Sequence, residues 1–433
     1  MSGREARGQA AAAPSVPPPP VAPAKVWTAN FILLWQGQLV SIFGDVVYAI
    51  ALRFWVLGAT GSTALMGALM AASTLPRILV SPFAGVFVDR FDRRALMIWM
   101  DAVRGAAVVA VALAAFGGFL QVWMVFAAGV VLGICGAFFT PAVSAIIPDI
   151  TAREKIVQAN SVFGMLQPAG NIVGNAAGGV LFSALGAPFL FLFNGLSYLF
   201  SAASLLFTRI PRVVHARAMA RFRDDLRAGL AFVWKIRGLR LLLLTAAVLN
   251  FFASMAIMLF LPFFQRNPGL GAARYGVAMA VFTAGSLIGM ALTASLKIPA
   301  RRRFLLFVLF GIEETVCLVA FPFSGSFGLS IVLLGAAGFG NAIINVFIMA
   351  VMQLAVPQEM RGKVFSLLGM LTQGLTPIAF AIAGVLAEFL PLPPLIAGCF
   401  AVALVAGVPV CLAPSFRRFI NFDPQKDTVE SVS

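Results

Sequence analysis

Long apolar runs separated by short polar breaks fill most of this chain. A helix needs about 20 apolar residues to cross about 30 Å of hydrocarbon, and the runs have this length. Barrel strands would be shorter and would alternate, so the pattern favours helices, which satisfy their own backbone groups in lipid. The sequence therefore predicts an all-α membrane protein with twelve transmembrane helices. The expected spans are 29–57, 63–88, 95–116, 121–147, 157–185, 188–208, 241–264, 273–296, 304–322, 327–355, 364–389 and 392–413.

One long polar interruption divides the twelve spans into six and six. The halves have the character of a repeat, because the loop from Pro148 to Ser161 corresponds in position to the loop from Val356 to Lys363. We therefore predict two six-helix pseudo-repeats, related by an axis along the membrane normal and enclosing a central cavity. The expected divisions are a disordered cytoplasmic tail at 1–26, an N-terminal bundle at 27–208, a linker at 209–240, a C-terminal bundle at 241–415 and a second cytoplasmic tail at 416–433.

The linker carries apolar residues at helical spacing opposite a basic face. This pattern predicts an amphipathic helix that lies on the cytoplasmic headgroups. The apolar positions are Phe222, Leu226, Leu230 and Val233, and the basic positions are Arg223, Arg227 and Arg237.

Composition and charge indicate on which side of the membrane the loops lie. The chain is 61% hydrophobic and only 11% charged, against about 25% charged in a soluble domain. Its net charge of +15 comes from cations in the loops on one side, whereas the opposite side has only Arg266 and Arg274. The positive-inside rule then predicts a multi-pass protein of a bacterial plasma membrane with both termini cytoplasmic. Spread in this way, the cations favour anionic lipid over nucleic acid as the neighbour.

The residues that would support metal or enzyme chemistry are scarce. His215 is the only histidine, and the four cysteines lie in apolar segments without metal-like spacing. No G-x-x-x-x-G-K-[ST] loop for a nucleotide occurs, and no nucleophile, base and orienting group can be assembled on one surface. We expect a non-enzymatic protein without metal or cofactor.

The segment 85–94 reads Gly-Val-Phe-Val-Asp-Arg-Phe-Asp-Arg-Arg. It resembles the G-x-L-x-D-R-x-G-R-R signature of major facilitator superfamily transporters, with Phe87 in place of Leu and Asp92 in place of the second Gly. Span five, at 170–179, is similar to the antiporter pattern G-x-x-x-G-P-x-x-G-G of that superfamily, with Asn175 in place of Pro. Span four lacks the Arg of many drug–proton antiporters.

Further phrases narrow the resemblance. The segments at 34–38, 75–77, 101–104 and 148–161 are similar to the branch that contains macrolide efflux proteins and the enterobactin exporter. The likeness extends over about residues 27 to 415. It implies alternating access between two six-helix halves.

Charged residues inside spans are the main functional candidates, because each costs about 2.5–3.5 kcal/mol at a helix centre even on the lenient insertion scale. Asp45 and Arg77 fall at similar depth, so they can form an ion pair that either exchanges during transport or holds the first hairpin permanently. Arg53 would make the outer half of this cleft positive. Asp101 and Arg104, at i,i+3 spacing, can neutralise each other, and the resemblance favours a scaffolding role for their helix.

Glu313 and Glu314 differ, because no Lys or Arg is expected to be buried in a span of the second half. Adjacent helical positions point about 100° apart, so we expect the two carboxyl groups to face different surroundings. At least one is expected to be protonated at rest and to carry protons. A hydrogen bond to a backbone carbonyl is the alternative.

The loop of 85–94 is interpreted as a gate. Its members are Gly85, Asp89, Arg90, Arg93 and Arg94. A carboxylate at Asp89 can bind the positive end of a helix of the other half, and by the resemblance that helix is span eleven, beginning near Lys363. For Arg93 and Arg94 the alternative is that they only fix topology.

Polar and aromatic residues in the helices expected to face the centre are the candidates for a substrate cavity. Buried amides either cross-link helices or meet substrate. The candidates are Gln36, Gln38, Asn171, Asn175, Asn250, Phe251, Met255, Asn341 and Asn345.

The sequence thus predicts a monomeric secondary exporter of a bulky hydrophobic or amphipathic small molecule, driven by proton entry. Two alternatives remain: a transporter of siderophore or lipid, and a non-transporting membrane sensor on the same scaffold.

Overall fold

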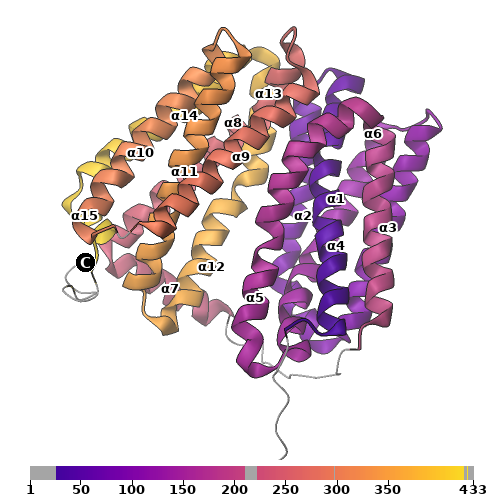
Figure 1. The fold of residues 1–433 in the computed structure, drawn as a ribbon, viewed down its shortest axis with the longest axis horizontal. Coiled ribbons are helices and arrows are strands. Elements are labelled where there is room, and N and C mark those ends of the chain that lie inside the picture. Colours follow the sequence, from indigo (N-terminus) through magenta and orange to yellow (C-terminus); the bar gives the residue numbers. More distant parts are fainter. Residues whose placement is uncertain (1–25, 210–221, 297, 424–426, 428–433) are drawn as a thin grey trace, which may run out of the picture.

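The computed structural model describes residues 26–209, 222–296, 298–423 and 427. The described chain is helical and contains no strand, which confirms the predicted all-α membrane fold (Figure 1). The helices of the N-terminal half are α1 (Ala29–Thr60), α2 (Thr63–Arg90), α3 (Arg93–Phe116), α4 (Val122–Ile150), α5 (Ile156–Gly164) and α6 (Leu166–Phe207). The helix α7 (Phe222–Lys235) follows, and then come α8 (Arg237–Arg266), α9 (Gly271–Ser295), α10 (Ala300–Ala320), α11 (Phe327–Ala355), α12 (Gln358–Gly374), α13 (Thr376–Phe389), α14 (Leu392–Leu412) and α15 (Pro414–Ile420).

Eleven segments of the described chain are long and apolar enough to cross a membrane. One of them, at 153–207, contains the 42 residues of α6, which as a straight helix would be about twice as long as the hydrocarbon is thick. At Gly186 the backbone leaves the helical region, with φ 75° and ψ 172°, and Pro188 follows. The segment is therefore two arms, 166–185 and 187–207. The prediction of twelve transmembrane helices requires that each arm crosses the membrane.

The fifth predicted span of each half is interrupted. In the first half α5 ends at Gly164 and α6 resumes at Leu166, and in the second half α12 ends at Gly374 and α13 resumes at Thr376. Span eleven therefore begins at Gln358, not near 364 as the apolar run alone suggests, because a polar helical turn precedes the hydrocarbon.

The helices pack mainly within their own half. In the first half α1 lies along both arms of α6, and α2, α3 and α4 complete the bundle. In the second half α8 packs on α13 and α14, and α11 packs on α9 and α10. The two halves lie side by side in Figure 1.

We call the end of the bundle that carries Arg93, Arg153, Arg361 and α7 the basic end, and the opposite end the far end. The tail at 1–25, the linker at 210–221 and most of the last tail lie outside the described residues.

The predicted amphipathic helix of the linker forms as α7, and its place on the headgroups stays a prediction. Val233 is buried in an apolar cluster with residues of α8, α11, α12 and α15, and Gly229 lies against Lys363 of α12. Leu230 and Trp234 stay exposed. The helix thus uses one apolar face to dock on the C-terminal half.

The bend at Gly186 gives a direct test of the two-arm fold. Its φ and ψ lie in a region that only glycine occupies readily, so Gly186→Ala is expected to destabilise the protein by about 1–3 kcal/mol. Thermal unfolding in detergent measures the change. Gly164→Ala is the control, because a Cβ there meets no neighbour within 4 Å. Equal unfolding midpoints for the two variants would contradict the bend.

Candidate functional site

A buried polar cluster lies inside the N-terminal half, between α1, α3, α4 and α6. Arg104 forms an ion pair with Asp101 on α3, as predicted from their spacing. The guanidinium group also lies over two aromatic rings, 4.2 Å from the centroid of Phe139 and 4.4 Å from that of Tyr198. The hydroxyl group of Tyr198 donates a hydrogen bond to the carboxylate of Asp45. One arginine thus connects both carboxyl groups, directly to Asp101 and through the Tyr198 ring to Asp45.

The second arm of α6 supplies the polar wall of this cluster. Asn194, Ser197 and Ser201 are all buried and share one helix face with Tyr198. Gly44 of α1 leaves room for them, since a Cβ there would lie 2.6 Å from the amide oxygen of Asn194. Sequence reasoning missed these four residues, although polar side chains at i, i+3, i+4 and i+7 in an apolar run are a usable signal.

The members of the cluster differ in accessibility. Asp101 is 0% exposed and Arg104 is 6% exposed, whereas Asp45 is only half-buried.

The expected ion pair between Asp45 and Arg77 does not form. Among the described residues no cation lies within 4 Å of the Asp45 carboxylate. Arg77 instead donates to the hydroxyl group of Thr140 on α4, at 3.3 Å. The side chains of the two residues meet different neighbours, Tyr198 for Asp45 and Thr140 for Arg77. Arg53 also forms no pair and donates to the backbone oxygen of Ala49, one turn away.

A second group of polar residues lies between α10 and α11. Glu314 accepts a hydrogen bond of 2.8 Å from Asn341, and Asn345 donates to the side-chain and backbone oxygens of Asn341. The carboxyl group of Glu313 lies against the backbone of Gly340. Both glutamates meet α11 but have different neighbours, as expected: Glu314 accepts from the amide of Asn341, whereas Glu313 lies against Gly340 and accepts 3.7 Å from the thiol of Cys317. Neither is paired with a described cation.

Two of the predicted gate residues fasten helices within their own half. Arg93 donates 2.7 Å to Asp149 of α4, and Arg94 donates 2.9 Å to the backbone oxygen of Leu205. The side chains of Gly85, Asp89 and Arg90 lie outside the described set. A gating role for the segment stays a prediction.

The predicted cavity residues are distributed over several surroundings. Asn171, Asn250 and Asn345 are exposed, Asn175 and Phe251 are half-buried, and Gln38 is buried two turns from Asp45 on the same face of α1. Gln36 shares instead the face of Phe43, which lines an outer groove of α1. Met255, expected at the centre, lines a groove between α8, α13 and α14.

The halves meet at the far end through two seams of small residues. In one seam α2 crosses α13 at Gly67 and Gly384, where a Cβ on Gly384 would lie 2.6 Å from the backbone oxygen of Thr63. In the other, the first arm of α6 crosses α9 at Gly179 and Gly276, and a Cβ on Gly179 would lie 2.8 Å from the Gly276 nitrogen. No side chain fits between the backbones at either crossing.

A polar clasp reinforces the first seam at its outer edge. Glu388 of α13 accepts 2.7 Å from the hydroxyl group of Ser62 and 2.9 Å from the backbone nitrogen of Ala64, at the start of α2. A carboxylate is favoured at such a helix N-terminus. Arg266 of α8 donates 2.8 Å to the backbone oxygen of Gly61. Sequence reasoning missed the clasp because its members are more than 200 residues apart.

Below the seam between α6 and α9, the contact face of α6 becomes polar. Asn175 and Asn171 lie one and two turns from Gly179 on that face, toward the basic end. The close contact between the halves thus lies at the far end. Toward the basic end, the same face of α6 carries amide side chains and exposed residues.

Gly67→Leu tests whether this seam holds the far end closed. The added side chain would overlap the backbone oxygen of Phe380, so we expect the far-end distance between the halves to lengthen. Electron–electron double resonance between spin labels at Phe119 and Phe323, which are exposed far-end residues of the two halves, measures it. Gly325→Leu is the control, since a Cβ there meets nothing within 4 Å. Identical distance distributions for the two variants would contradict the seam's role.

Three comparisons with known proteins place this architecture among transporters. Residues 20–425 match the family model described as transmembrane secretion effector. Macrolide efflux protein A of Streptococcus pyogenes is 27% identical over 369 residues, which cover 84% of this chain and 90% of that protein. Multidrug efflux pump Tap of Mycobacterium tuberculosis (strain CDC 1551 / Oshkosh) is 26% identical over 419 residues, which cover 92% of this chain and 96% of that protein.

Solved structures show the same fold at low identity. A bacterial homologue of the iron transporter ferroportin, in an inward-facing state, superposes with a TM-score of 0.66 at 16% identity, over 89% of this chain and 99% of that one. A bacterial homologue of the human lysosomal transporter Spinster gives a TM-score of 0.62 at 16% identity, over 90% and 96% of the two chains.

Proposed function

Because this chain belongs to the transmembrane secretion effector family of the major facilitator superfamily, and is an efflux transporter like its relatives, we propose that it exports a bulky hydrophobic or amphipathic small molecule in exchange for protons. The substrate class follows the names of the macrolide and multidrug efflux relatives. A wholly helical scaffold rich in Phe and Met would suit such molecules.

The observation that carries the proton step is the charge balance of the cluster around Arg104. Two carboxyl groups lie around one guanidinium group, Asp101 in direct contact with it and Asp45 through Tyr198. With both ionised, the cluster holds one excess negative charge inside the bilayer, where a lone charge is costly. A proton on Asp45 makes the cluster neutral.

Exchange follows from this balance. When Asp45 releases its proton, the excess negative charge attracts a cationic group of the substrate, and when a proton returns, that attraction is lost. Proton and substrate thus compete for one charge, which couples their opposite movements. Tyr198 positions the Asp45 carboxylate toward Arg104 and conveys the change to α3 and α6.

Alternating access would occur by rocking of the two halves. We place the basic end in the cytoplasm by the positive-inside rule, so the closed far end is extracellular and the present conformation is open to the inside. The thin glycine seams suit this motion, because backbones that meet without interlocking side chains can separate.

Asp45→Asn tests the proton site. It keeps the size of the side chain and removes the exchangeable charge, so proton-driven export is expected to fall at least tenfold. The measurement uses proteoliposomes with an imposed pH gradient, a lipophilic fluorescent cation and a macrolide as substrates, and an internal pH dye. Glu154→Gln, at an exposed site of the basic end, is the control and should behave as the unchanged protein.

Tyr198→Phe separates positioning from proton carriage. Loss of one hydroxyl group should weaken export severalfold and shift its pH dependence, yet leave coupled proton movement detectable. If Asp45→Asn exported both substrates with undiminished proton flux, the proposed site would be wrong.

The second half offers a rival proton carrier. Glu313 and Glu314 have no described cation beside them, so either can be neutral and titratable in the bilayer. Glu313→Gln and Glu314→Gln, made separately, should leave coupling intact if the cluster around Arg104 is the carrier. Loss of proton flux in either variant, with Asp45→Asn still active, would show that the proton carrier is a glutamate of α10.

A further inference from the structure

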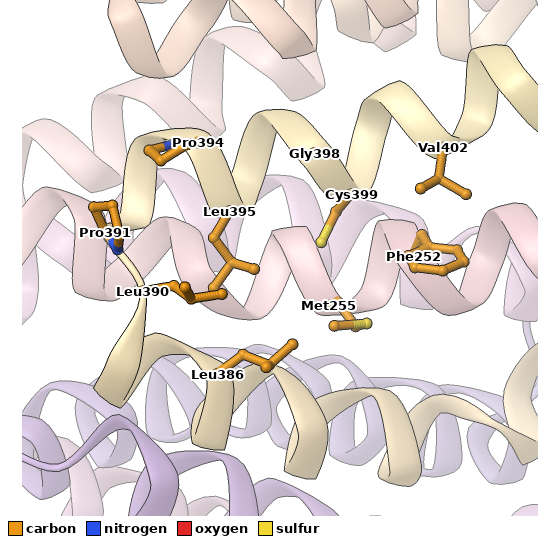
Figure 2. A pocket seen from close by; sticks show the side chains of 10 residues that line it. All are labelled: Phe252, Met255, Leu386, Leu390, Pro391, Pro394, Leu395, Gly398, Cys399 and Val402. Atoms are coloured by element: carbon orange, nitrogen blue, oxygen red, sulfur yellow. The ribbon is translucent and has the colours of Figure 1, made fainter.

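Each half carries one apolar groove on its outer surface. The first-half groove has a volume of about 370 Å³ and is lined by Phe43, Val47, Leu181, Leu185, Phe189, Leu190, Leu192, Phe193 and Leu196. The second-half groove has a volume of about 300 Å³ and is lined by Phe252, Met255, Leu386, Leu390, Pro391, Pro394, Leu395, Gly398, Cys399 and Val402. Figure 2 shows the second-half groove, with side chains of α8, α13 and α14 converging on one space.

The grooves are repeats of one another. Each is built from the first, fifth and sixth helix of its half, at the corner where the fifth helix turns into the sixth. Five lining positions of α6 recur 205 residues later in the second half, and so does the seam glycine, since Gly179 corresponds to Gly384. The matched lining pairs are Leu181 and Leu386, Leu185 and Leu390, Phe189 and Pro394, Leu190 and Leu395, and Phe193 and Gly398.

Both grooves open away from the contact between the halves. On α13, Leu386 and Leu390 lie two and six residues after the seam residue Gly384, which places them about 200° and 240° around the helix from it. The same spacing holds on α6 after Gly179. On α1, Phe43 and Val47 lie two residues to either side of Asp45, on the opposite face of the helix. The grooves therefore face the surrounding bilayer and not the polar interior.

The floors of the grooves are sealed and the rims are open. Val47 is 0% exposed and Leu190 2%, whereas Phe189 and Leu196 at the rim are 53% and 51% exposed. In the second-half groove Met255 and Cys399 form a similar floor. Water has no polar partner there, and an empty groove would forfeit the dispersion contacts of its walls. Because these helices are candidate membrane spans, we infer that bilayer lipid surrounds the rim.

We propose that each groove binds one acyl chain of a membrane phospholipid, so that the protein retains two phospholipids as structural ligands at related positions. Each chain would lie in the corner between the fifth and sixth helices and pack on the first helix. Because each groove belongs to one half, rocking of the halves leaves both lipids bound. The inference depends on membrane insertion and not on the proposed proton exchange.

Native mass spectrometry of the full-length protein, released from detergent micelles, tests the proposal. The unchanged protein is expected to retain up to two phospholipid masses. Gly398→Phe fills the second-half groove without a clash, because a Cβ there meets nothing within 4 Å, and should lower the two-lipid population at least threefold. Gly407→Phe is the matched control, since this residue lies on the opposite face of α14 and is equally unobstructed.

Two further variants keep the test decisive. Phe193→Ala widens the first-half groove without adding bulk and should maintain or raise lipid retention even if Gly398→Phe folds poorly. Asp45→Asn should retain both lipids, which separates this proposal from the transport mechanism. Equal retention in Gly398→Phe and Gly407→Phe would overturn it, and so would retained masses that match detergent or an added amphiphile in place of phospholipid.

Discussion

Charge inside hydrocarbon must be neutralised by groups that the protein itself supplies, and Arg104 is where this constraint acts on the fold. Its guanidinium group pairs with Asp101 of its own helix and lies over the rings of Phe139 and Tyr198. The planar cation thus attracts aromatic faces from α4 and from the second arm of α6. A single arginine holds three helices of the first half around one point.

The contact between the halves obeys a different constraint, because it has to form and break. Gly67, Gly384, Gly179 and Gly276 bring backbones together without side chains that interlock. Most of the specificity at the outer edge of this contact comes from the hydrogen bonds between Glu388 and the start of α2. These hydrogen bonds are exposed to water, which can replace each of them when the contact opens, so their net contribution is small. Such a contact is stable enough to hold the far end closed, and opening it costs little free energy.

The sequence predicted the parts of the fold that depend on length, hydrophobicity and local spacing. The runs of about 20 residues gave the helices, and the i,i+3 spacing gave the ion pair of Asp101 and Arg104. The partner of Asp45 could not be obtained in this way. The depth of a residue in the membrane can be estimated from residue counts along its helix. The direction in which its side chain points depends on how α1 packs on α6. Tyr198 lies 153 residues from Asp45 in the sequence, so local spacing could not predict this contact.

Other differences have the same origin in tertiary packing. The amphipathic pattern of α7 is equally compatible with a lipid surface and with a protein surface, and Val233 docks on the C-terminal half. Met255 falls in a helix expected to line the centre, yet its position on α8 turns it to the outside. In each case the helix was predicted correctly, but the local sequence does not determine which surface the helix face contacts.

The two halves share a scaffold and differ in the charges that they contain, and the proposed coupling depends on this difference. The repeat preserves the seam glycines and the grooves at the corner of the fifth and sixth helices, which are features of packing. It does not preserve the polar interior. The first half compensates its carboxyl groups with Arg104, whereas the second half sets Glu314 against an amide, Asn341, at 2.8 Å. The amide of Asn341 can accept a hydrogen bond from a protonated Glu314 carboxyl group or donate one to its ionised form, so this pair can stay hydrogen-bonded in either state. In the mechanism that we propose, a proton on Asp45 neutralises a cluster whose fixed cation, Arg104, contacts aromatic rings of α4 and α6. The proposed coupling therefore lies in the first half, where Tyr198 connects the titrating carboxyl group to Arg104 of α3.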